Sequence, residues 1–295
     1  MSTPPFVALP SCARALRLST ARGDFAALEA LPDGPVRATA LLVPGFTGSK
    51  EDFIALLAPL SAAGLRVVAV DQRGQYESGG PADEAVYALP ELGLDVRALS
   101  EAVAGRGTAA DRGPLHLLGH SFGGYVVRES VLAADAPLPW SSLTLMSTGP
   151  AAIDPAEAVR TKMLLDALTV MDLEAIWQVM QEMDAGSDPT GLPSPEVADF
   201  LHHRWVSNVP QSLSAMARRL IGESDRVAEL AAAPLPKLVL SGDRDYAWPV
   251  PWQSEMAERL GARRVVVSGA GHSPNAERPL ETARALLDFW TSVPS

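Results

Sequence analysis

Short apolar runs alternate with longer amphipathic segments along most of the chain. The apolar runs predict strands at residues 15–19, 25–30, 38–43, 66–70, 115–118, 143–146, 238–240 and 264–267. Apolar positions spaced three and four apart predict helices at residues 50–63, 89–104, 123–134, 253–260 and 280–290. This alternation is typical of a mostly parallel sheet with helices on both faces, so we expect an α/β fold with eight strands.

The first two predicted strands differ from the others in how they are connected. Residues 20–24, which include Gly23, form a link that is too short for a crossover connection. A link of this length joins two antiparallel strands as a hairpin. We therefore expect an antiparallel pair at the start of an otherwise parallel sheet.

The alternation stops between residues 150 and 233, where helical periodicity continues without a convincing strand. We interpret residues 150–233 as a helical lid inserted after the sixth strand, and residues 1–149 and 234–295 as the α/β core. The lid contains Trp177, Trp205 and five of the eight methionines: Met163, Met171, Met180, Met183 and Met216. Because methionine is flexible and polarizable, these side chains suit either a pocket for varied apolar ligands or the core of the lid itself.

Composition limits the classes of protein to which this chain can belong. With 295 residues, 47% of them apolar, the chain can bury enough surface for one large domain. Its apolar runs fall far short of the roughly 20 residues that a membrane-spanning helix needs. The net charge of −11 argues against nucleic acid as a partner. The pattern does not specify an oligomeric state.

The N-terminal residues and the cysteine content bear on the cellular compartment. Residues 1–6 lack the positive segment and the unbroken apolar stretch of a secretory signal, which favours a cytoplasmic location. Cys12 is the single cysteine, so the sequence excludes an internal disulfide bond. We expect Cys12 to be a small, at least partly buried apolar residue.

Residues 119–123, Gly-His-Ser-Phe-Gly, match the pattern GxSxG. A predicted strand lies directly before this motif and a predicted helix directly after it. The two glycines permit a sharp strand-to-helix turn that exposes the hydroxyl of Ser121. The free amides at the start of the helix would then stabilise negative charge next to that hydroxyl. We therefore predict that Ser121 is a nucleophile.

A serine hydroxyl needs a neighbouring base to become nucleophilic, and five histidines are available. His272 is the best candidate because it lies in a glycine-containing loop after the last predicted strand. Asp243 and Asp245 follow the preceding strand, and a carboxylate there can hold the imidazole in the required tautomer. We choose Asp245 and leave Asp243 as the alternative, with a turn-capping role otherwise. We expect structural roles for the remaining histidines, which are His116, His120, His202 and His203.

An oxyanion hole needs two backbone amides directed at the developing negative charge. The amide of Phe122, directly after the predicted nucleophile, is one candidate. The second should come from the loop after the third strand, where we assign it to Phe46. Pro44, in the same loop, has no amide hydrogen and cannot donate.

These loops occur in the chain order of the α/β-hydrolase superfamily, which the sequence resembles over nearly its whole length. Residues 71–74, Asp-Gln-Arg-Gly, are similar to that family's loop after the fourth strand. Two departures are Pro44, where many members have histidine, and residues 75–78, where a small glycine-rich turn is common. The resemblance implies an α/β-hydrolase fold that uses no metal and no organic cofactor. Because members that open haloalkanes or epoxides use aspartate at the turn, Ser121 argues against that chemistry.

The resulting hypothesis is a serine hydrolase that cleaves a small or medium, largely apolar carboxylic ester, thioester or lactone through an acyl-serine intermediate. Cleavage of amide, peptide or carbon–carbon bonds by the same triad is one alternative. A ligand-binding receptor with little turnover is another. A substrate with a free amine would need an acidic subsite in the lid, for which the candidates are Glu174, Glu182 and Asp184.

A small-molecule substrate is the partner that this hypothesis requires. We expect its pocket to be lined by aromatic or apolar residues close in sequence to the predicted catalytic positions, and by an aromatic residue of the lid. The candidates are Phe46, Phe122, Met146, Trp177 and Trp248.

Overall fold

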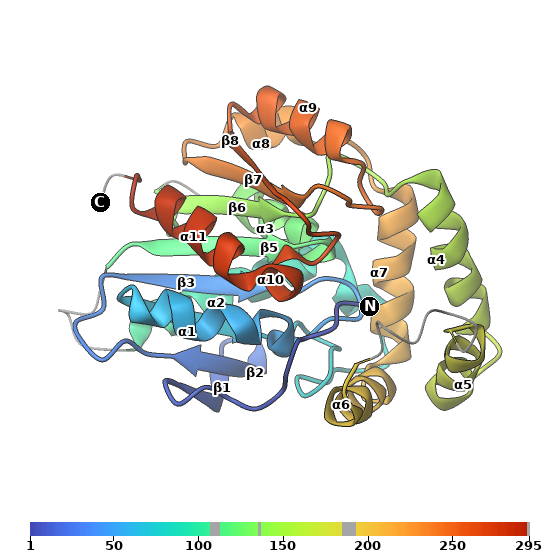
Figure 1. Ribbon diagram of the computed structural model, residues 1–295. Coiled ribbons are helices and arrows are strands. Elements are labelled where there is room, and N and C mark those ends of the chain that lie inside the picture. The colour runs from blue at the N-terminus through green and yellow to red at the C-terminus, as the bar shows by residue number, and fades with distance from the viewer. Residues whose placement is uncertain (107–112, 135–136, 185–192, 294–295) are drawn as a thin grey trace.

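The computed structural model describes residues 1–106, 113–134, 137–184 and 193–293. Within these ranges, eight strands form one sheet in the order β1-β2-β4-β3-β5-β6-β7-β8 (Figure 1). The strands are β1 (Ala13–Thr20), β2 (Gly23–Ala30), β3 (Ala38–Val43), β4 (Leu65–Val70), β5 (Leu115–His120), β6 (Ser142–Met146), β7 (Lys237–Gly242) and β8 (Arg263–Val267). The eight predicted strands are confirmed, each within two residues of its predicted ends.

The sheet begins with antiparallel pairs and continues as a parallel sheet. β1 pairs with β2 and β2 with β4 in antiparallel fashion, which confirms the predicted hairpin, and the remaining neighbours are parallel. The register aligns Val43 with Gly119 and His120 with Met146, so the carboxyl ends of these strands share one edge. Loops that are distant in the sequence therefore meet at this edge, where ligands of open α/β sheets bind.

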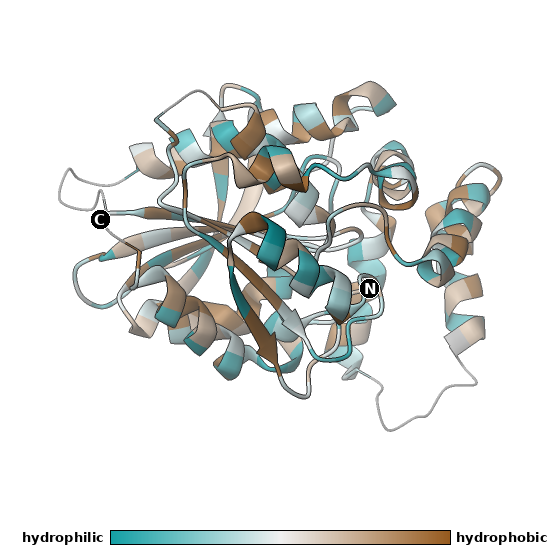
Figure 2. Ribbon diagram, turned by 90° about the horizontal axis from the view of Figure 1, so that it is seen from above, coloured by the Kyte–Doolittle hydropathy of each residue, from teal (hydrophilic) through white to brown (hydrophobic). Residues whose placement is uncertain are grey.

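The central strands are apolar along their whole length because helices cover both faces of the sheet. Every residue of β3 and of β4 is buried, whereas in β1, at the edge, Leu18 is buried and the other residues are exposed or half-buried. Figure 2 shows mostly apolar colours on the strands inside the molecule and mixed colours on the surrounding helices.

The helices divide into two layers. One layer packs on one face and includes α2 (Leu89–Gly105), α3 (Phe122–Leu132) and α9 (Val250–Leu260). The other face is covered by α1 (Ile54–Ala62) and α11 (Pro279–Trp290) (Figure 1). The helix predicted at residues 50–63 begins as a 3₁₀ turn, η1 (Lys50–Phe53), and a second 3₁₀ turn, η2 (Glu84–Tyr87), precedes α2. The short helix α10 (Pro274–Glu277) was not predicted.

A group of helices follows β6 and precedes β7, and all of them except the last, which packs beside α9, lie beyond the carboxyl edge of the sheet (Figure 1). The group consists of α4 (Pro155–Ala167), α5 (Leu173–Asp184), α6 (Pro195–Val206), α7 (Pro210–Gly222) and α8 (Val227–Ala231). These helices lie within the range predicted to be a lid, of which residues 185–192 lie outside the described part. The division of the chain into core and lid stays a prediction, and we use "lid" below for residues 150–233.

The hydropathy of the helices also bears on membrane insertion. In the described ranges, no helix has both the length and the apolar character needed to cross a bilayer.

Candidate active site

Ser121 occupies the sharp turn between the end of β5 and the start of α3. Its backbone has φ of 54° and ψ of −123°, a strained conformation for a residue with a side chain. The turn requires glycine beside it, because a Cβ at Gly123 would lie 2.5 Å from the carbonyl oxygens of Pro44 and Val43. This conformation directs the Ser121 hydroxyl away from the sheet and toward the loops that follow β7 and β8.

The three residues predicted to act together are within hydrogen-bonding distance of one another. The Nε2 atom of His272 lies 3.0 Å from the Oγ atom of Ser121. On the other side of the ring, His272 Nδ1 lies 2.9 Å from Asp245 Oδ1. With Nδ1–H donating to the carboxylate, Nε2 is free to accept the serine proton. The structure therefore brings together Ser121, His272 and Asp245 in the order that proton transfer requires.

Asp245 is held by several donors besides the histidine. Its Oδ1 atom accepts a hydrogen bond from the amide of Ala247 at 3.0 Å, and its Oδ2 atom accepts one from Gln253 Nε2 at 2.9 Å. Burial alone would raise the pKa of Asp245, but the hydrogen bonds and the charge of His272 hold it below its usual value. The carboxylate therefore stays ionised and can stabilise a protonated His272. Gln253, buried on α9, was not identified from the sequence.

Asp243, the alternative carboxylate, has a different set of partners. Its Oδ2 atom accepts hydrogen bonds from the amide of Gly269 at 2.8 Å and from the hydroxyl of Ser268 at 3.3 Å. Its side chain is 38% exposed. Asp243 thus links the loops after β7 and β8.

His120, next to Ser121, supports the loop that carries His272. Its Nε2 atom lies 2.9 Å from the carbonyl oxygen of His272, and the ring is fully packed inside the protein. Burial lowers the pKa of His120 to about 3, so the ring is neutral at physiological pH and its N–H can donate to that carbonyl.

The loop after β3 lies directly against Ser121. A Cβ on Gly45 would come within 2.7 Å of the Ser121 Cβ atom, so only glycine allows this approach. The carbonyl groups of Pro44 and Gly45 accept hydrogen bonds from Gln72 Nε2 and Gln75 Nε2, each at 2.7 Å. Gln75 belongs to the segment that departs from the family pattern, and its role was not identified from the sequence.

These contacts bear on the two predicted oxyanion-hole amides. The N–H of Phe46 shares a trans peptide unit with the carbonyl of Gly45 and points the opposite way. Because that carbonyl faces Gln75, the Phe46 amide faces away from Gln75. Phe122 is the first residue of α3, so its amide has no acceptor within the helix. The two amides stay the proposed donors of an oxyanion hole.

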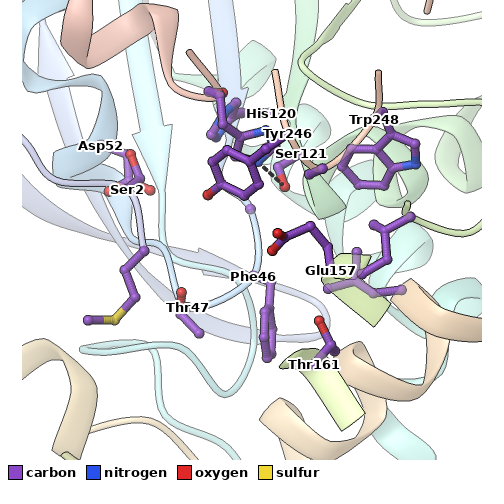
Figure 3. A pocket seen from close by; sticks show the side chains of 16 residues that line it. Ser2, Phe46, Thr47, Asp52, His120, Ser121, Glu157, Thr161, Tyr246 and Trp248 are labelled. Atoms are coloured by element: carbon purple, nitrogen blue, oxygen red, sulfur yellow. Dashed lines mark hydrogen bonds between the residues drawn. The ribbon is translucent and has the colours of Figure 1, made fainter. Parts of the chain in front are cut away.

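A cavity of about 130 Å³ opens over Ser121 and His272 (Figure 3). Its apolar wall includes Phe46, Ile153 and Trp248, and its polar wall includes Glu157, Thr161 and Tyr246. Tyr246 also packs its ring against His272, with 5.1 Å between the ring centroids. Glu157 and Thr161 come from α4, so the lid supplies part of the cavity.

The residues that were predicted to line the pocket do not all lie at the cavity. Phe46 and Trp248 line the cavity. Met146 is buried in the apolar cluster between the sheet and the layer of α1 and α11, and Trp177 packs in a cluster within the lid. Phe122, the first residue of α3, is buried in the main apolar core.

The lid methionines and the candidate acidic residues lie elsewhere. Met216 is buried in the main core, whereas Met163 and Met183 are 58% and 68% exposed. Glu174 pairs with His202 at 2.7 Å on the outside of the lid, and Glu182 is exposed. The side chain of Asp184 lies outside the described part of the chain. The carboxylate that α4 places in the cavity is Glu157, which was not identified from the sequence.

Over residues 1–106, 113–134, 137–184 and 193–293, no three His, Cys, Asp or Glu side chains form a group that could hold a metal ion.

Comparisons with known proteins agree with this architecture. The alpha/beta hydrolase family model matches residues 40–285. A protein of Variovorax paradoxus named as a carbamate hydrolase is 28% identical, over 88% of this chain and 94% of its own. A monoacylglycerol lipase of Mycolicibacterium smegmatis is also 28% identical, over 79% of each chain. The structure of an esterase from Thermogutta terrifontis superimposes with a TM-score of 0.72 at 22% identity, over 96% of this chain and all of the other.

The family match covers most of the chain, from within β3 to within α11. It therefore includes the turn at Ser121 and the loops that carry Asp245 and His272. The chain belongs to the alpha/beta hydrolase family.

Proposed function

We propose that this alpha/beta hydrolase cleaves small or medium carboxylic esters through an acyl-serine intermediate. The observation that carries the proposal is the continuous hydrogen-bonded chain from Ser121 through His272 to Asp245, with distances of 3.0 Å and 2.9 Å, beneath a cavity. A serine so paired is activated as a nucleophile by the neighbouring base.

The geometry supports a two-step mechanism. In the first step, Ser121 Oγ bonds to the ester carbonyl carbon while its proton passes to His272 Nε2. The tetrahedral oxyanion accepts hydrogen bonds from the amides of Phe46 and Phe122. Collapse breaks the bond to the alkoxide, which leaves with the proton from His272. In the second step, water attacks the acyl carbon while its proton passes to His272. Collapse then breaks the bond to Ser121 Oγ, which takes the proton back from His272, and the acid is released.

The size and lining of the cavity support a short substrate. A volume of about 130 Å³ has room for roughly four water molecules, which favours an acyl or alcohol group of a few carbons. Phe46, Ile153 and Trp248 provide apolar surface for such a group. The relative named as a monoacylglycerol lipase also acts, by its name, on an ester.

A panel of chromogenic esters with increasing acyl length tests the proposal. We expect turnover that peaks at short chains and falls by on the order of 10⁴-fold or more in Ser121→Ala. A fluorophosphonate should label the parent protein at Ser121 and leave Ser121→Ala unlabelled. Ser19→Ala is the matched control, because Ser19 is exposed on the edge strand β1 and should not affect either readout.

The same panel distinguishes the alternative activities. Turnover of amides in preference to esters would contradict the ester proposal while keeping the nucleophile. Tight ligand binding with turnover far below about 1 per second would instead indicate a binding protein.

A further inference from the structure

The Asp, Glu, Lys and Arg side chains that line the cavity have one sign. Among the described residues that line it, Asp52 and Glu157 carry carboxylates, and none is a lysine or an arginine. The charge of Asp52 is compensated, because its Oδ1 atom lies 2.7 Å from Arg204 Nη1 and both side chains are fully buried. Of the two carboxylates, Glu157 is therefore the one that can contact a substrate.

Glu157 has a weaker partner than Asp52. Its Oε1 atom lies 2.7 Å from Arg160 Nη1, one turn further along α4. The Arg160 side chain is 76% exposed, whereas that of Glu157 is 17% exposed. An ion pair with so exposed an arginine contributes little energy and can be replaced by a substrate group. The pair therefore leaves the Glu157 carboxylate available to the cavity.

The orientation of Glu157 fits a role in binding. Figure 3 shows its side chain reaching from α4 into the cavity, with the carboxylate directed toward the Ser121 side and Tyr246 and Phe46 beside it. Burial, followed by the negative charges of Glu157, Asp245 and Glu277, raises the pKa of Tyr246 to about 12. The phenol therefore stays neutral, so Tyr246 adds no charge to the cavity.

A carboxylate in this place opposes the reaction unless the substrate compensates for it. Negative charge develops on the carbonyl oxygen during attack by Ser121, and a fixed negative charge in the same cavity destabilises that state. A hydrogen-bond donor or a cation on the substrate removes this penalty by binding Glu157 in a charge-assisted hydrogen bond.

We propose that Glu157 determines the substrate class, and that the cavity selects esters that carry a protonated amine near the scissile bond over isosteric neutral and anionic esters. This inference rests on the proposed ester hydrolysis. A hydroxyl group on the substrate can also donate a hydrogen bond to the Glu157 carboxylate, but it binds that carboxylate less strongly than a protonated amine does.

An isosteric series of butyrate esters tests the inference. The alcohol is 2-(dimethylamino)ethanol for the cation, 3-methylbutanol for the neutral ester and 3-hydroxypropanoate for the anion. kcat/KM for each ester is measured by titration of the released acid. We expect the parent protein to rank them cation, neutral, anion, with steps of about tenfold, since an ionic hydrogen bond is worth roughly that much or more.

Two variants of α4 should shift the ranking in opposite directions. Glu157→Gln keeps the shape and removes the charge, so the ratio of cation to neutral ester should fall about tenfold. Arg160→Gln frees the Glu157 carboxylate, so the same ratio should rise. Glu174→Gln is the matched control, because Glu174 is a lid carboxylate on the outer surface that does not line the cavity. An unchanged ratio in Glu157→Gln would overturn the inference.

A second measurement keeps this result separate from the proposed function. The amides N-[2-(dimethylamino)ethyl]butanamide and N-(3-methylbutyl)butanamide are compared as protectors of Ser121 against fluorophosphonate labelling. We expect the cationic amide to protect at lower concentration in the parent protein but not in Glu157→Gln. If none of the esters turns over while this difference persists, ester hydrolysis fails and the selectivity stands. Equal protection by the two amides in the parent protein would overturn the selectivity.

Discussion

At the scale of single residues, the orientation of one peptide unit depends on a buried glutamine. Gln75 is completely buried and donates to the carbonyl of Gly45 at 2.7 Å, while its Oε1 atom accepts a hydrogen bond from the amide of Gln72 at 3.1 Å. The bond to Gly45 fixes the direction of the Phe46 amide in the same peptide unit. Gln75 is therefore a positioning residue for the proposed oxyanion hole.

Replacement of Gln75 by methionine should lower kcat with little change in KM. The near-isosteric side chain removes the donor, so the Gly45 carbonyl loses its partner and the Phe46 amide loses its fixed direction. An oxyanion donor acts only in the transition state, and its loss typically costs on the order of 10² in kcat. Steady-state kinetics on a chromogenic ester measure kcat and KM separately. The control is Gln178→Met at an exposed position of α5. A rise in KM at constant kcat would contradict this role.

Only part of the candidate site could be predicted from single residues. The proximity of Ser121, Asp245 and His272 was predictable because each lies in a loop after a strand, and the carboxyl ends of parallel strands meet at one edge. Gln253 and Glu157 were not, because their roles depend on how α9 and α4 are rotated about their axes. That rotation is set by packing between elements that the local pattern does not describe.

At the scale of elements, β5 shows how burial sets the state of ionisable groups. His116 lies on the face of β5 that is covered by α11, where its ring stacks on Trp290 with centroids 5.3 Å apart. Its Nδ1 atom lies 2.8 Å from Ser142 Oγ on β6. Burial lowers the pKa of His116 from 6.5 to about 4. The folded state therefore keeps His116 neutral where the unfolded chain takes up a proton.

This difference should make the protein less stable in mild acid. Because the folded-state pKa of His116 is depressed, its contribution to stability is present above pH 6.5 and is lost as pH falls toward about 4. Between pH 6.5 and pH 5 the loss is about 2 kcal/mol, at 1.36 kcal/mol per pH unit. Urea unfolding at pH 7 and pH 5 should therefore show a smaller pH effect in His116→Gln than in the parent protein. Equal differences in the two proteins would contradict the assignment.

The elements themselves follow closely from the apolar pattern, with informative exceptions. Strands buried on both faces, such as β3 and β4, appear as short continuous apolar runs and are easily recognised. The short helix α10 was missed because its four residues are too few to show helical periodicity. Its start at Pro274 fits the fixed φ angle of proline, a signal that could have located it.

At the scale of the whole molecule, one buried ion pair joins segments that are distant in the sequence. Arg204 on α6 contacts Asp52 of η1 through Nη1 at 2.7 Å, and its Nη2 atom donates to the carbonyl of Ser2 at 2.7 Å. Asn275 of α10, close after His272, donates to the carbonyl of Asp52 at 2.6 Å. Figure 1 shows the N-terminus between the sheet and the lid helices, where Met1 and Ser2 line the cavity. The lid, the N-terminal segment and the histidine loop are thus tied together.

The sequence could not predict this junction, because it depends on how the lid is placed on the core. The helical periodicity predicts a helix-rich lid, but the periodicity does not indicate which lid residue faces which core residue. Asp52 and Arg204 are 152 positions apart, and each alone is typical of a solvent-exposed helix position. Their complete burial becomes evident only when the two elements are packed against each other.

The junction predicts a pH-dependent stability defect in Arg204→Met. Removal of one partner of a buried ion pair leaves an uncompensated charge and typically costs about 3 to 5 kcal/mol. Burial raises the pKa of Asp52 to about 6 even though Arg204 lowers it, so loss of Arg204 should raise that pKa further. The carboxylate is then destabilising only where it is ionised. Urea unfolding should therefore show that Arg204→Met loses more of the free energy of unfolding at pH 8 than at pH 5.

A double-mutant cycle separates the ion pair from simple loss of packing. Asp52→Asn removes the charge that Arg204 compensates, so the combination of Asp52→Asn with Arg204→Met should be less destabilising than the sum of the single changes. We expect a coupling of about 1 kcal/mol or more between the two positions at pH 8, as is usual for residues in one network. Asn at position 52 also cannot titrate, so the defect of the double variant should vary less with pH than that of Arg204→Met. Additive effects at both pH values would mean that Arg204 stabilises the lid by packing alone.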